Sequence, residues 1–344
     1  MKVIQVLNAL DYGDGVCNDA YHIRDLLIKM GYQTEIYSRY VHEKCKRDAK
    51  DISLLKADRD DIIIHHFAGE SVVHEEVFAC NCRKILRYHN VTPDIFMQGE
   101  VTEITAAEKQ LLTIWQNYDY LIAVSEFNKQ CMQNLGVTGE IAVVPILMKF
   151  DKFANLTPLY HRRKRFLAVG RIARNKKCED TIKIFEQYYS NFDVDSELYF
   201  VGNYQGYEDY YEELKQLLNS CKCKNRVHFT GKVSDQELYD YYRSSDIFIC
   251  MSEHEGFCIP LIESMAMKLP TIAYDACAVK DTMGDAGVLV KDKDYLTIAK
   301  LCYMILHNRD MKEQMIDRQC NWISNFSEES IENKLKEIFE RVKK

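Results

Sequence analysis

Two glutamates stand eight positions apart in the segment EHEGFCIPLIE, which covers residues 253–263. The apolar run directly before it, IFICMS, is typical of a buried strand, and Pro260 is tolerated in the first turn of a helix. We therefore expect Glu255 in the loop after the strand and Glu263 about one turn into the helix. Placed in this way, the two carboxylates would reach different parts of one extended ligand.

The residues between the two glutamates suit an anionic ligand. Gly256 lets the backbone approach a ligand closely. The N–H groups around Phe257 and Cys258 would point at an anion bound at the start of the helix. Two unrelated surface glutamates would not explain why the glycine, the proline and the strand-loop-helix pattern occur together.

A cluster of positive charge follows another strand-like run, FLAVG (166–170). Arg171 comes first, and Asn175, Lys176 and Lys177 follow within the same loop. Arginine offers a planar fork and lysine a point charge, and both suit a diphosphate. A solvated basic turn is the alternative, but the position directly after a glycine-ended strand favours the phosphate site.

A glycine loop follows the first strand-like run of the chain and leads into a helix. Gly13 and Gly15 in NALDYGDGVCNDA (8–20) permit close approach of a ligand to the backbone, and the helix start favours an anion. A dinucleotide-binding fingerprint would have a third glycine where Asn18 stands. The loop therefore disfavours a Rossmann dehydrogenase, and an ordinary glycine turn is its alternative reading.

Three histidines are predicted at strand ends in the first half of the chain. His65 and His66 end the run DIIIHH, and His89 ends ILRYHN. A histidine at such a position can orient a substrate hydroxyl or exchange a proton. A structural role is the alternative for each of them, and we favour a functional one for His89, which Asn90 and Pro93 follow.

Elements that could position these residues alternate along the whole chain. Short β-rich runs are separated by amphipathic helical stretches, a pattern that predicts parallel sheets with helices on both faces. The expected strands lie at 3–7, 34–38, 61–66, 83–90, 120–125, 141–145, 166–170, 197–202, 227–231, 247–252, 270–275 and 287–290. The clearest helices are expected near 18–30, 104–118, 126–136, 178–189, 296–308 and 328–344.

The pattern restarts after the basic stretch TPLYHRRKR (157–165), which divides the chain into two domains. We expect an α/β protein with two doubly wound Rossmann-like domains that face a cleft, at 1–155 and 156–325. The last helix, 326–344, should pack back toward the first domain. Ligands of open α/β sheets lie beyond the carboxyl ends of the strands, where the residues above are found.

Composition excludes several classes of protein. The chain has 344 residues and a net charge of −7, so it is not built to coat nucleic acid. It shows no export signal and no run of the roughly 20 apolar residues that a spanning helix needs. We expect a cytoplasmic protein, and peripheral contact with the inner face of the cell membrane stays open.

We expect no metal and no cofactor. The 13 cysteines are expected as reduced thiols, and the pairs Cys80/Cys82 and Cys221/Cys223 have no second pair at a zinc-like spacing. An Asp-x-Asp metal site would follow a strand. DRD (58–60) precedes its strand instead, and DVD (193–195) and DKD (292–294) are typical of exposed loops.

The segments around the glutamates resemble a known family. EGFCIPLIE matches the E-x7-E pattern of retaining glycosyltransferases of the GT-B architecture, especially glycosyltransferase family 4 (group 1). VGRIARNKKCEDTIKIF and the long stretch from VHFTGKVSD to PTIAYD are similar to donor-domain segments of that family. YHNVTPDIF and SEFNKQCMQNLGV are similar to first-domain segments of a bacterial branch, so the resemblance covers most of the chain.

The resemblance implies a nucleotide-sugar site in the second domain. Arg171 and Lys176 would hold the donor diphosphate, and Glu263 would hydrogen-bond the ribose. Glu255, with the amides of Gly256 to Ile259, would contact the donor sugar. The chemistry implied is sugar transfer with retention of configuration and without a metal, because the arginine, the lysine and helix N-termini can stabilise the departing diphosphate.

Further positions follow from the same resemblance. Val233, with Asp235 nearby, would lie by the base, and His89 by the reacting carbon and the hydroxyl groups of the sugar. The Gly13–Gly15 loop would close over the phosphate from the first domain. The family usually has glycine where Cys258 stands, which puts the fit around the sugar in question.

Partners implied by the resemblance are a nucleotide-sugar donor and a glycan or lipid-linked acceptor. Two alternatives remain open at this level: a non-catalytic module that binds nucleotide sugars, and another GT-B enzyme such as a nucleotide-sugar epimerase. The sequence names neither the donor sugar nor the acceptor.

Overall fold

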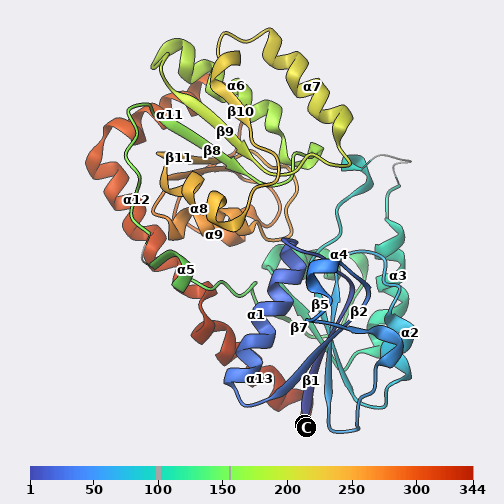
Figure 1. The fold of residues 1–344 in the computed structure, drawn as a ribbon. Helices are drawn as coiled ribbons and strands as arrows, with labels where there is room; N and C mark the ends of the chain where they lie inside the picture. The colour runs from blue at the N-terminus through green and yellow to red at the C-terminus, as the bar shows by residue number, and fades with distance from the viewer. Residues whose placement is uncertain (98–101, 155, 344) are drawn as a thin grey trace. The chain divides into compact units, whose positions relative to one another are not determined.

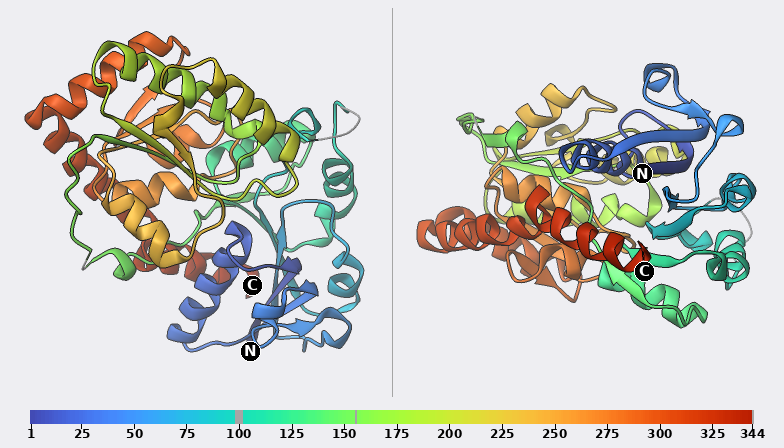
Figure 2. Two further views of the ribbon diagram at one scale, coloured as in Figure 1. Left: turned by 45° about the horizontal axis from the view of Figure 1, so that its top comes forward. Right: turned by 90° about the horizontal axis from the view of Figure 1, so that it is seen from below.

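The structure of the protein, a computed structural model, describes residues 1–97, 102–154 and 156–343. It divides into two compact units. The first unit comprises Met1–Lys149 and Asn325–Lys344, and the second comprises Phe150–Ser324. The change between units lies at 149/150, whereas the sequence suggested 155/156. Each unit contains one parallel sheet flanked by helices (Figure 1, Figure 2).

The sheet of the first unit has seven strands in the order β3-β2-β1-β4-β5-β6-β7, and all of its pairings are parallel. The strands are β1 (Lys2–Leu10), β2 (Gln33–Val41), β3 (Lys50–Asp51), β4 (Ile62–Phe67), β5 (Arg83–Tyr88), β6 (Tyr120–Ala123) and β7 (Ile141–Val143). The helices are α1 (Gly15–Lys29), α2 (His74–Ala79), α3 (Ala106–Ile114), α4 (Glu126–Leu135) and α13 (Glu328–Lys343).

The last helix, α13, belongs to the first unit because of its apolar stripe. Ile331, Leu335, Ile338 and Phe339 are buried in the same cluster as Ile85 of β5. Their spacing of three and four residues puts them on one face of the helix. The C-terminal segment is thus part of the core of the first unit, although the whole second unit separates it from that core in sequence.

The sheet of the second unit has six strands in the order β10-β9-β8-β11-β12-β13, again all parallel. The strands are β8 (Arg165–Val169), β9 (Glu197–Val201), β10 (Val227–Phe229), β11 (Ile247–Cys250), β12 (Thr271–Tyr274) and β13 (Val288–Val290). The helices are α5 (Asp151–Ala154), α6 (Cys178–Asn191), α7 (Glu208–Asn219), α8 (Asp235–Arg243), α9 (Ile259–Ala266), α10 (Val279–Met283), α11 (Tyr295–His307) and α12 (Arg309–Trp322).

Short 3₁₀ helices complete the two units. They are η1 (Glu43–Cys45), η2 (Ile52–Leu54), η3 (Asp94–Phe96), η4 (Trp115–Asn117), η5 (Arg174–Lys176), η6 (Lys224–Arg226) and η7 (Ile323–Phe326). All twelve expected strands are present, and β3 is an additional strand of two residues. The sequence pattern also missed α12, whose exposed faces carry no strong apolar stripe.

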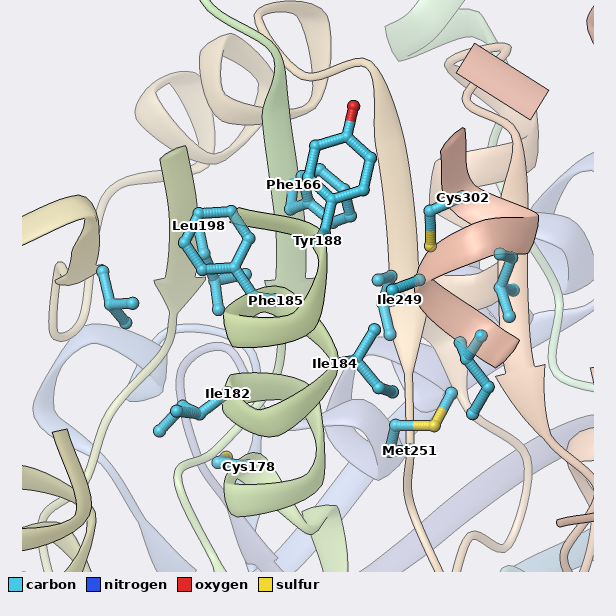
Figure 3. Close-up of a cluster of buried hydrophobic side chains, with 14 of the residues drawn as sticks. Phe166, Cys178, Ile182, Ile184, Phe185, Tyr188, Leu198, Ile249, Met251 and Cys302 are labelled. Carbon is cyan, nitrogen blue, oxygen red and sulfur yellow. The ribbon is translucent and has the colours of Figure 1, made fainter. Parts of the chain in front are cut away.

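An aromatic cluster fixes α6 on the sheet of the second unit. Phe185 and Tyr188 of α6 are fully buried against Phe166 of β8, with ring centroids 5.3 and 4.6 Å from that of Phe166. Figure 3 shows Phe185 and Tyr188 on α6 close to Phe166. Truncating a buried phenylalanine to alanine costs about 3–5 kcal/mol, so the cluster holds the C-terminal half of α6 firmly on the sheet.

The strand order reverses between two neighbouring strands in each unit. In the second unit β8 leads to β9 and β10 on one side, and β11 leads to β12 and β13 on the other. The loops after β8 and β11 therefore diverge and leave a crevice at the carboxyl ends of the strands, where doubly wound proteins bind ligands.

Among the described residues, no helix combines the length and the apolar character needed to cross a bilayer.

Candidate active site

A pocket lies at the point where β8 and β11 part. Its walls come from the ends of these two strands, from the loop that starts at Gly170 and from the first turn of α6. The residues that line it are Ala168, Val169, Gly170, Arg171, Ile172, Lys176, Cys178, Thr181, Phe200, Ile249, Cys250, Met251 and Ser252. Two of the residues predicted to hold a diphosphate, Arg171 and Lys176, are among them.

Hydrogen bonds join the loop after β8 to the loop after β11. The backbone N–H of Glu253 donates to the Asn175 carbonyl at 2.8 Å. In return, Nδ2 of Asn175 donates to the His254 carbonyl at 3.0 Å. Asn175 was predicted as part of the anion-binding loop, and its side chain instead holds the two loops together.

Lys176 and Glu255 form an ion pair across this junction. Nζ of Lys176 lies 2.6 Å from Oε1 of Glu255, and the two side chains are only 22% and 8% exposed. Burial alone would lower the pKa of Lys176, but the Glu255 carboxylate raises it by more, so that the net shift is upward. The lysine thus stays charged in a poorly hydrated place, where its charge acts more strongly on a ligand than it would in water.

Arg171 is exposed at the mouth of the pocket and forms no ion pair with any residue that the structure describes. The loop that carries it packs closely on the neighbouring loop after β9. A Cβ atom at Gly202, where φ is +155°, would lie 1.9 Å from the carbonyl oxygen of Gly170. Only glycine fits there, so Gly202 helps to set the course of the backbone that presents Arg171.

Lys177 does not face the pocket as its neighbour does. It adopts a left-handed conformation with φ of +50°, and its Nζ lies 3.4 Å from Glu253 and 3.5 Å from Glu179. The two adjacent lysines therefore form ion pairs with different residues, although the sequence pattern suggests a single cluster.

Lys293 is a partly buried residue whose ion pairs the sequence reasoning missed. Its Nζ lies 2.6 Å from Asp180 of α6 and 2.6 Å from Glu253, and it is 17% exposed. The DKD segment is typical of an exposed loop, and Asp292 and Asp294 are indeed exposed, but the lysine between them is not. No local signal marks this residue, because both carboxylates come from distant parts of the chain.

Cys258 adopts a left-handed backbone conformation directly before α9, with φ of +74°. This conformation costs an ordinary residue free energy but costs glycine none, which explains why a glycine would suit the position. The thiol is buried, and its Sγ lies 3.8 Å from Sγ of Cys250. Pro260 lies in the first turn of α9 as expected.

The other residues of the segment lie as their positions in the chain predict. Gly256 and Ile259 are partly exposed, whereas Phe257 is buried and its carbonyl accepts a hydrogen bond from the Thr282 hydroxyl. Val233, between β10 and α8, is half-buried against the apolar cluster that also contains Cys258.

Glu263 is buried in α9 and has its own set of partners. Tyr242 donates a hydrogen bond from its hydroxyl to Oε2 at 3.0 Å, and Nζ of Lys152 lies 3.6 Å from Oε1. Burial raises the pKa of Glu263, and Lys152 and Tyr242 counteract this only in part. The prediction that Glu255 lies in the loop and Glu263 one turn into the helix is correct, and the two carboxylates face different neighbours.

In the first unit, His66 and His89 form a stacked, hydrogen-bonded pair. Nδ1 of His66 lies 2.9 Å from Nε2 of His89, and the ring centroids are 5.2 Å apart. Asp19 of α1 lies 3.7 Å from His89 and receives two hydrogen bonds from Arg87. His89 thus belongs to a buried network rather than standing alone at a strand end.

His65 belongs to a separate network. Its Nδ1 lies 2.6 Å from the Tyr118 hydroxyl and its Nε2 3.1 Å from the Ser71 hydroxyl. Burial lowers the pKa of His65 to about 3. The structural alternative is the better description of this histidine.

The glycine loop after β1 is a tight turn into α1. Gly13 has φ of +80°, and Gly15 is the first residue of the helix. Between them, the Asp14 carboxylate accepts hydrogen bonds from the amides of Val16 and Cys17. A side chain of the protein therefore already uses two of the amides that could hold an anion at the start of α1.

Three groups of side chains among the described residues lie close enough to hold a metal ion. They are Asp19–His66–His89, Glu186–Cys221–Cys223 and Cys250–Glu255–Cys258. In each group the carboxylate already has protein partners, which are Arg87 for Asp19, the amides of Lys222 and Cys223 for Glu186, and Lys176 for Glu255. Each of the three carboxylates is therefore already hydrogen-bonded or ion-paired within the protein.

Comparison with known proteins identifies the family to which the second unit belongs. The family model for glycosyl transferases group 1 matches residues 150–322, which is half of the chain and nearly the whole of the second unit. The chain is 26% identical over 206 residues to an uncharacterized glycosyltransferase of Haemophilus influenzae, covering 58% of this chain and 55% of that one. It is 25% identical over 130 residues to the O-antigen chain mannosyltransferase B of Escherichia coli, covering 38% and 34%.

The chain therefore spans between a third and about half of the length of these curated relatives. Solved structures match over almost the full chain. A glycosyltransferase from Rickettsia africae superposes with a TM-score of 0.80 at 19% identity, covering 99% of this chain and 98% of that one. The Anabaena protein Alr3699/HepE, solved in complex with UDP and glucose, has a TM-score of 0.75 at 15% identity and 99% coverage of both chains.

These similarities agree with the observed architecture. The structural matches show the fold alone, and they confirm the expected α/β class with two doubly wound domains, the GT-B architecture. The match over residues 150–322 covers the pocket between β8 and β11 and both glutamates. On this evidence, the chain belongs to the family of glycosyl transferases group 1.

Proposed function

We propose that the protein is a retaining glycosyltransferase of family 4 that transfers a sugar from a nucleoside-diphosphate sugar to a glycan or lipid-linked acceptor. The observation that carries the proposal is the partly buried Lys176–Glu255 pair, which lies beside exposed Arg171 at the reversal point of a doubly wound sheet. A relative named as an O-antigen chain mannosyltransferase and a structural neighbour solved with UDP and glucose support the same substrate classes.

The diphosphate would bind at the pocket between β8 and β11. Arg171 can form a forked pair with phosphate oxygens, and the Lys176 ammonium can hold a second phosphate oxygen. As the bond to the sugar breaks, negative charge grows on the diphosphate, and cations that are already in place stabilise it. Protein groups thus supply the stabilisation for which other transferases use a metal, so we propose a metal-independent reaction.

The two glutamates would hold the two ends of the donor. Glu255 accepts hydrogen bonds from hydroxyl groups of the sugar, with the amides of Gly256, Phe257, Cys258 and Ile259 next to it. Glu263 accepts hydrogen bonds from the ribose, and Lys152 helps to keep it ionised. Val233 would pack against the base.

The first unit would contribute His89 to the hydroxyl groups of the sugar and the Gly13–Gly15 loop to the phosphate. The acceptor would attack on the face from which the diphosphate leaves, which retains the configuration. The proposed place of action is the cytoplasm, at the membrane surface if the acceptor is a lipid.

A panel of nucleotide sugars tests this proposal. The protein is incubated with each donor and a mixture of glycan and lipid-linked acceptors, and release of nucleoside diphosphate is followed with and without EDTA. We expect release with at least one donor, unchanged by EDTA. Loss of release in EDTA would contradict the metal-independent reaction. Binding without release would indicate a non-catalytic module, and a sugar inverted on its intact nucleotide would indicate an epimerase.

Two neighbouring lysines provide a matched control for the site. Lys176→Ala should weaken donor binding by at least about tenfold, because it removes a charge-assisted contact of about 1.5–3 kcal/mol. Lys177→Ala removes the same charge one residue later, where it faces Glu253 and Glu179. We expect its donor affinity to stay within about twofold of the parent, a difference of only about 0.4 kcal/mol. Equal losses in both variants would refute the assignment of the site.

A further inference from the structure

Five polar residues in the interior of the first unit form a hydrogen-bonded network. We call this the buried histidine network: Gln5 of β1, Asp19 of α1, His66 of β4, Arg87 of β5, and His89 directly after β5. All five are buried, and three of them are fully inaccessible. Buried polar groups need partners of the right kind, so each hydrogen bond here constrains the position of the next proton.

Gln5 sets the direction of the chain of hydrogen bonds. Its Nε2 donates to the Ala20 carbonyl at 2.9 Å, so the other end of the amide is an oxygen that can only accept. That oxygen, Oε1, lies 3.0 Å from Nε2 of His66. Nε2 of His66 must therefore carry a proton.

The surroundings keep His66 neutral. Arg87 already balances the charge of Asp19, through Nε at 2.6 Å and Nη2 at 3.1 Å. A second positive charge would have no counter-charge in this buried place. Burial lowers the pKa of His66 well below its ordinary value, and His89 adds to the effect. With its single proton on Nε2, His66 has an unprotonated Nδ1 that accepts a hydrogen bond.

The next nitrogen in the chain belongs to His89. Because Nδ1 of His66 accepts, Nε2 of His89 at 2.9 Å must donate and so carries a proton. Burial, and Arg87 after it, lower the pKa of His89 well below its ordinary value, so this ring is neutral as well. Nδ1 of His89 is then an unprotonated acceptor, and it is buried without a hydrogen-bond partner among the described residues.

We propose that Gln5 and His66 are positioning residues that hold His89 with its proton on Nε2, so that Nδ1 serves only as a hydrogen-bond acceptor for a hydroxyl group of the sugar. In this arrangement Nδ1 of His89 cannot donate a proton to the substrate. The tautomer follows from the network alone, whereas the identity of the ligand rests on the proposed function.

The same residues could be read as a metal site, since ligand atoms of Asp19, His66 and His89 lie within 4.8 Å of one another. Both oxygens of Asp19 are already bound, Oδ2 by Arg87 and Oδ1 by Arg87 and by the amide of Leu147 at 3.3 Å. A cation would also lie next to a guanidinium group. The geometry therefore points to hydrogen bonds between the rings instead of a metal bridge.

NMR of the full-length protein with ¹⁵N-labelled histidine rings tests the tautomer directly, because protonated and unprotonated ring nitrogens resonate far apart. A His89→Asn variant identifies the signals. We expect Nε2 of His89 to be protonated and Nδ1 unprotonated throughout pH 6 to 8. A protonated Nδ1 would overturn the proposal. Zinc that shifts the signals of both rings at an equimolar amount would overturn it in favour of a metal site.

Two glutamine variants test the positioning role. Gln5→Leu removes the acceptor for His66, and we expect both histidines to show mixed tautomers and kcat/KM to fall at least about tenfold. Gln110→Leu is the control, because Gln110 binds Ser71 and not the histidine pair. It should leave the His89 signals and kcat/KM within about twofold of the parent. Unchanged His89 signals and activity in Gln5→Leu would overturn the proposal.

The two parts of the proposal can fail separately. If Gln5→Leu does not fold, the spectrum of the parent protein still decides the tautomer. If the protein turns over no nucleotide sugar, the proposed function and the sugar contact fail together, while the ring nitrogens still report on the network. If turnover occurs and the tautomer is as expected, but a His89→Asn variant retains full kcat/KM, the sugar contact alone is wrong.

Discussion

Nζ of Lys176 lies 2.6 Å from Oε1 of Glu255, although 79 positions separate the two residues in the chain. The contact exists because β8 and β11 are neighbours in the sheet, so that the loops after them begin side by side. Asn175 bonds the same two loops together through the carbonyl of His254. When two opposite charges are this little exposed, removing one of them leaves the other unpaired and poorly hydrated, which destabilises the fold.

Breaking this pair should reduce stability as well as binding. Glu255→Ala leaves Lys176 charged and unpaired, and we expect the free energy of unfolding of the second unit to fall by about 1–3 kcal/mol. The double variant Lys176→Met/Glu255→Leu replaces both charges with apolar groups and should recover most of this loss. Urea unfolding measures both effects. The double variant should still fail to bind donor, and donor binding like that of the parent would contradict the assignment.

Glu263 should make the stability of the protein depend on pH. Its folded pKa is raised above the ordinary 4.5, so the folded state holds the proton more tightly than the unfolded chain. The stabilisation is complete below about pH 4.5 and is lost as pH rises through the folded pKa. Glu263→Gln, which resembles the protonated acid, should therefore gain stability relative to the parent as pH rises from 4 to 8.

Urea unfolding at several pH values measures the stability of Glu263→Gln and of the parent. The donor affinity of both proteins is measured at pH 8. We expect Glu263→Gln to be the more stable protein at pH 8 and yet to bind donor more weakly, because an amide accepts ribose hydroxyls less strongly than a carboxylate. A constant difference in stability across the pH range would show that Glu263 is not buried as a charged group.

Cys258 should tolerate glycine and reject valine. At φ of +74°, glycine is unstrained, and the relief offsets the loss of the buried thiol, so we expect Cys258→Gly to stay within about 1 kcal/mol of the parent. Valine is branched at Cβ and is a poor fit to this conformation, and Cys258→Val should cost about 2 kcal/mol or more. Unfolding followed by the fluorescence of Trp322 reports on this unit. Equal stability of the two variants would contradict the left-handed turn.

The buried histidines should make the first unit sensitive to mild acid. The pKa values of His65, His66 and His89 are lowered from 6.5 by burial, so the unfolded chain takes up protons first as pH falls. The stability is present above pH 6.5 and is lost below it, by about 1.4 kcal/mol per pH unit for each histidine. Because the unfolded histidines are only half protonated at pH 6.5, the three together should remove about 3 kcal/mol between pH 6.5 and 5.5.

The two tryptophans allow this measurement in one unit alone. Trp115 lies in the first unit and Trp322 in the second, so a Trp322→Phe background leaves only the reporter of the first unit. His65→Asn in that background should remove about one third of the pH dependence, because one of three equivalent protonations is lost. An unchanged pH dependence would show that His65 is not the neutral, buried group described here.

The sequence was sufficient to predict the secondary-structure elements and the position of the candidate site along the chain. Short β-rich runs and amphipathic stretches are local properties, and the β-rich runs predicted twelve strands of the two sheets. Pro260 and the strand before Glu255 correctly predicted a loop glutamate and a helix glutamate. These results depend on a few neighbouring residues, which is why they can be read without the fold.

The pairing of side chains came only from the tertiary structure. Two adjacent lysines looked equivalent, yet one pairs with Glu255 at the pocket and the other with Glu253 and Glu179. Likewise, the sequence alone predicted neither the position of Lys293 between two carboxylates nor the proton positions in the buried histidine network. The physical reason is that hydrogen bonds and ion pairs act over about 3–4 Å, and only the folded sheet brings residues from distant strands within that distance.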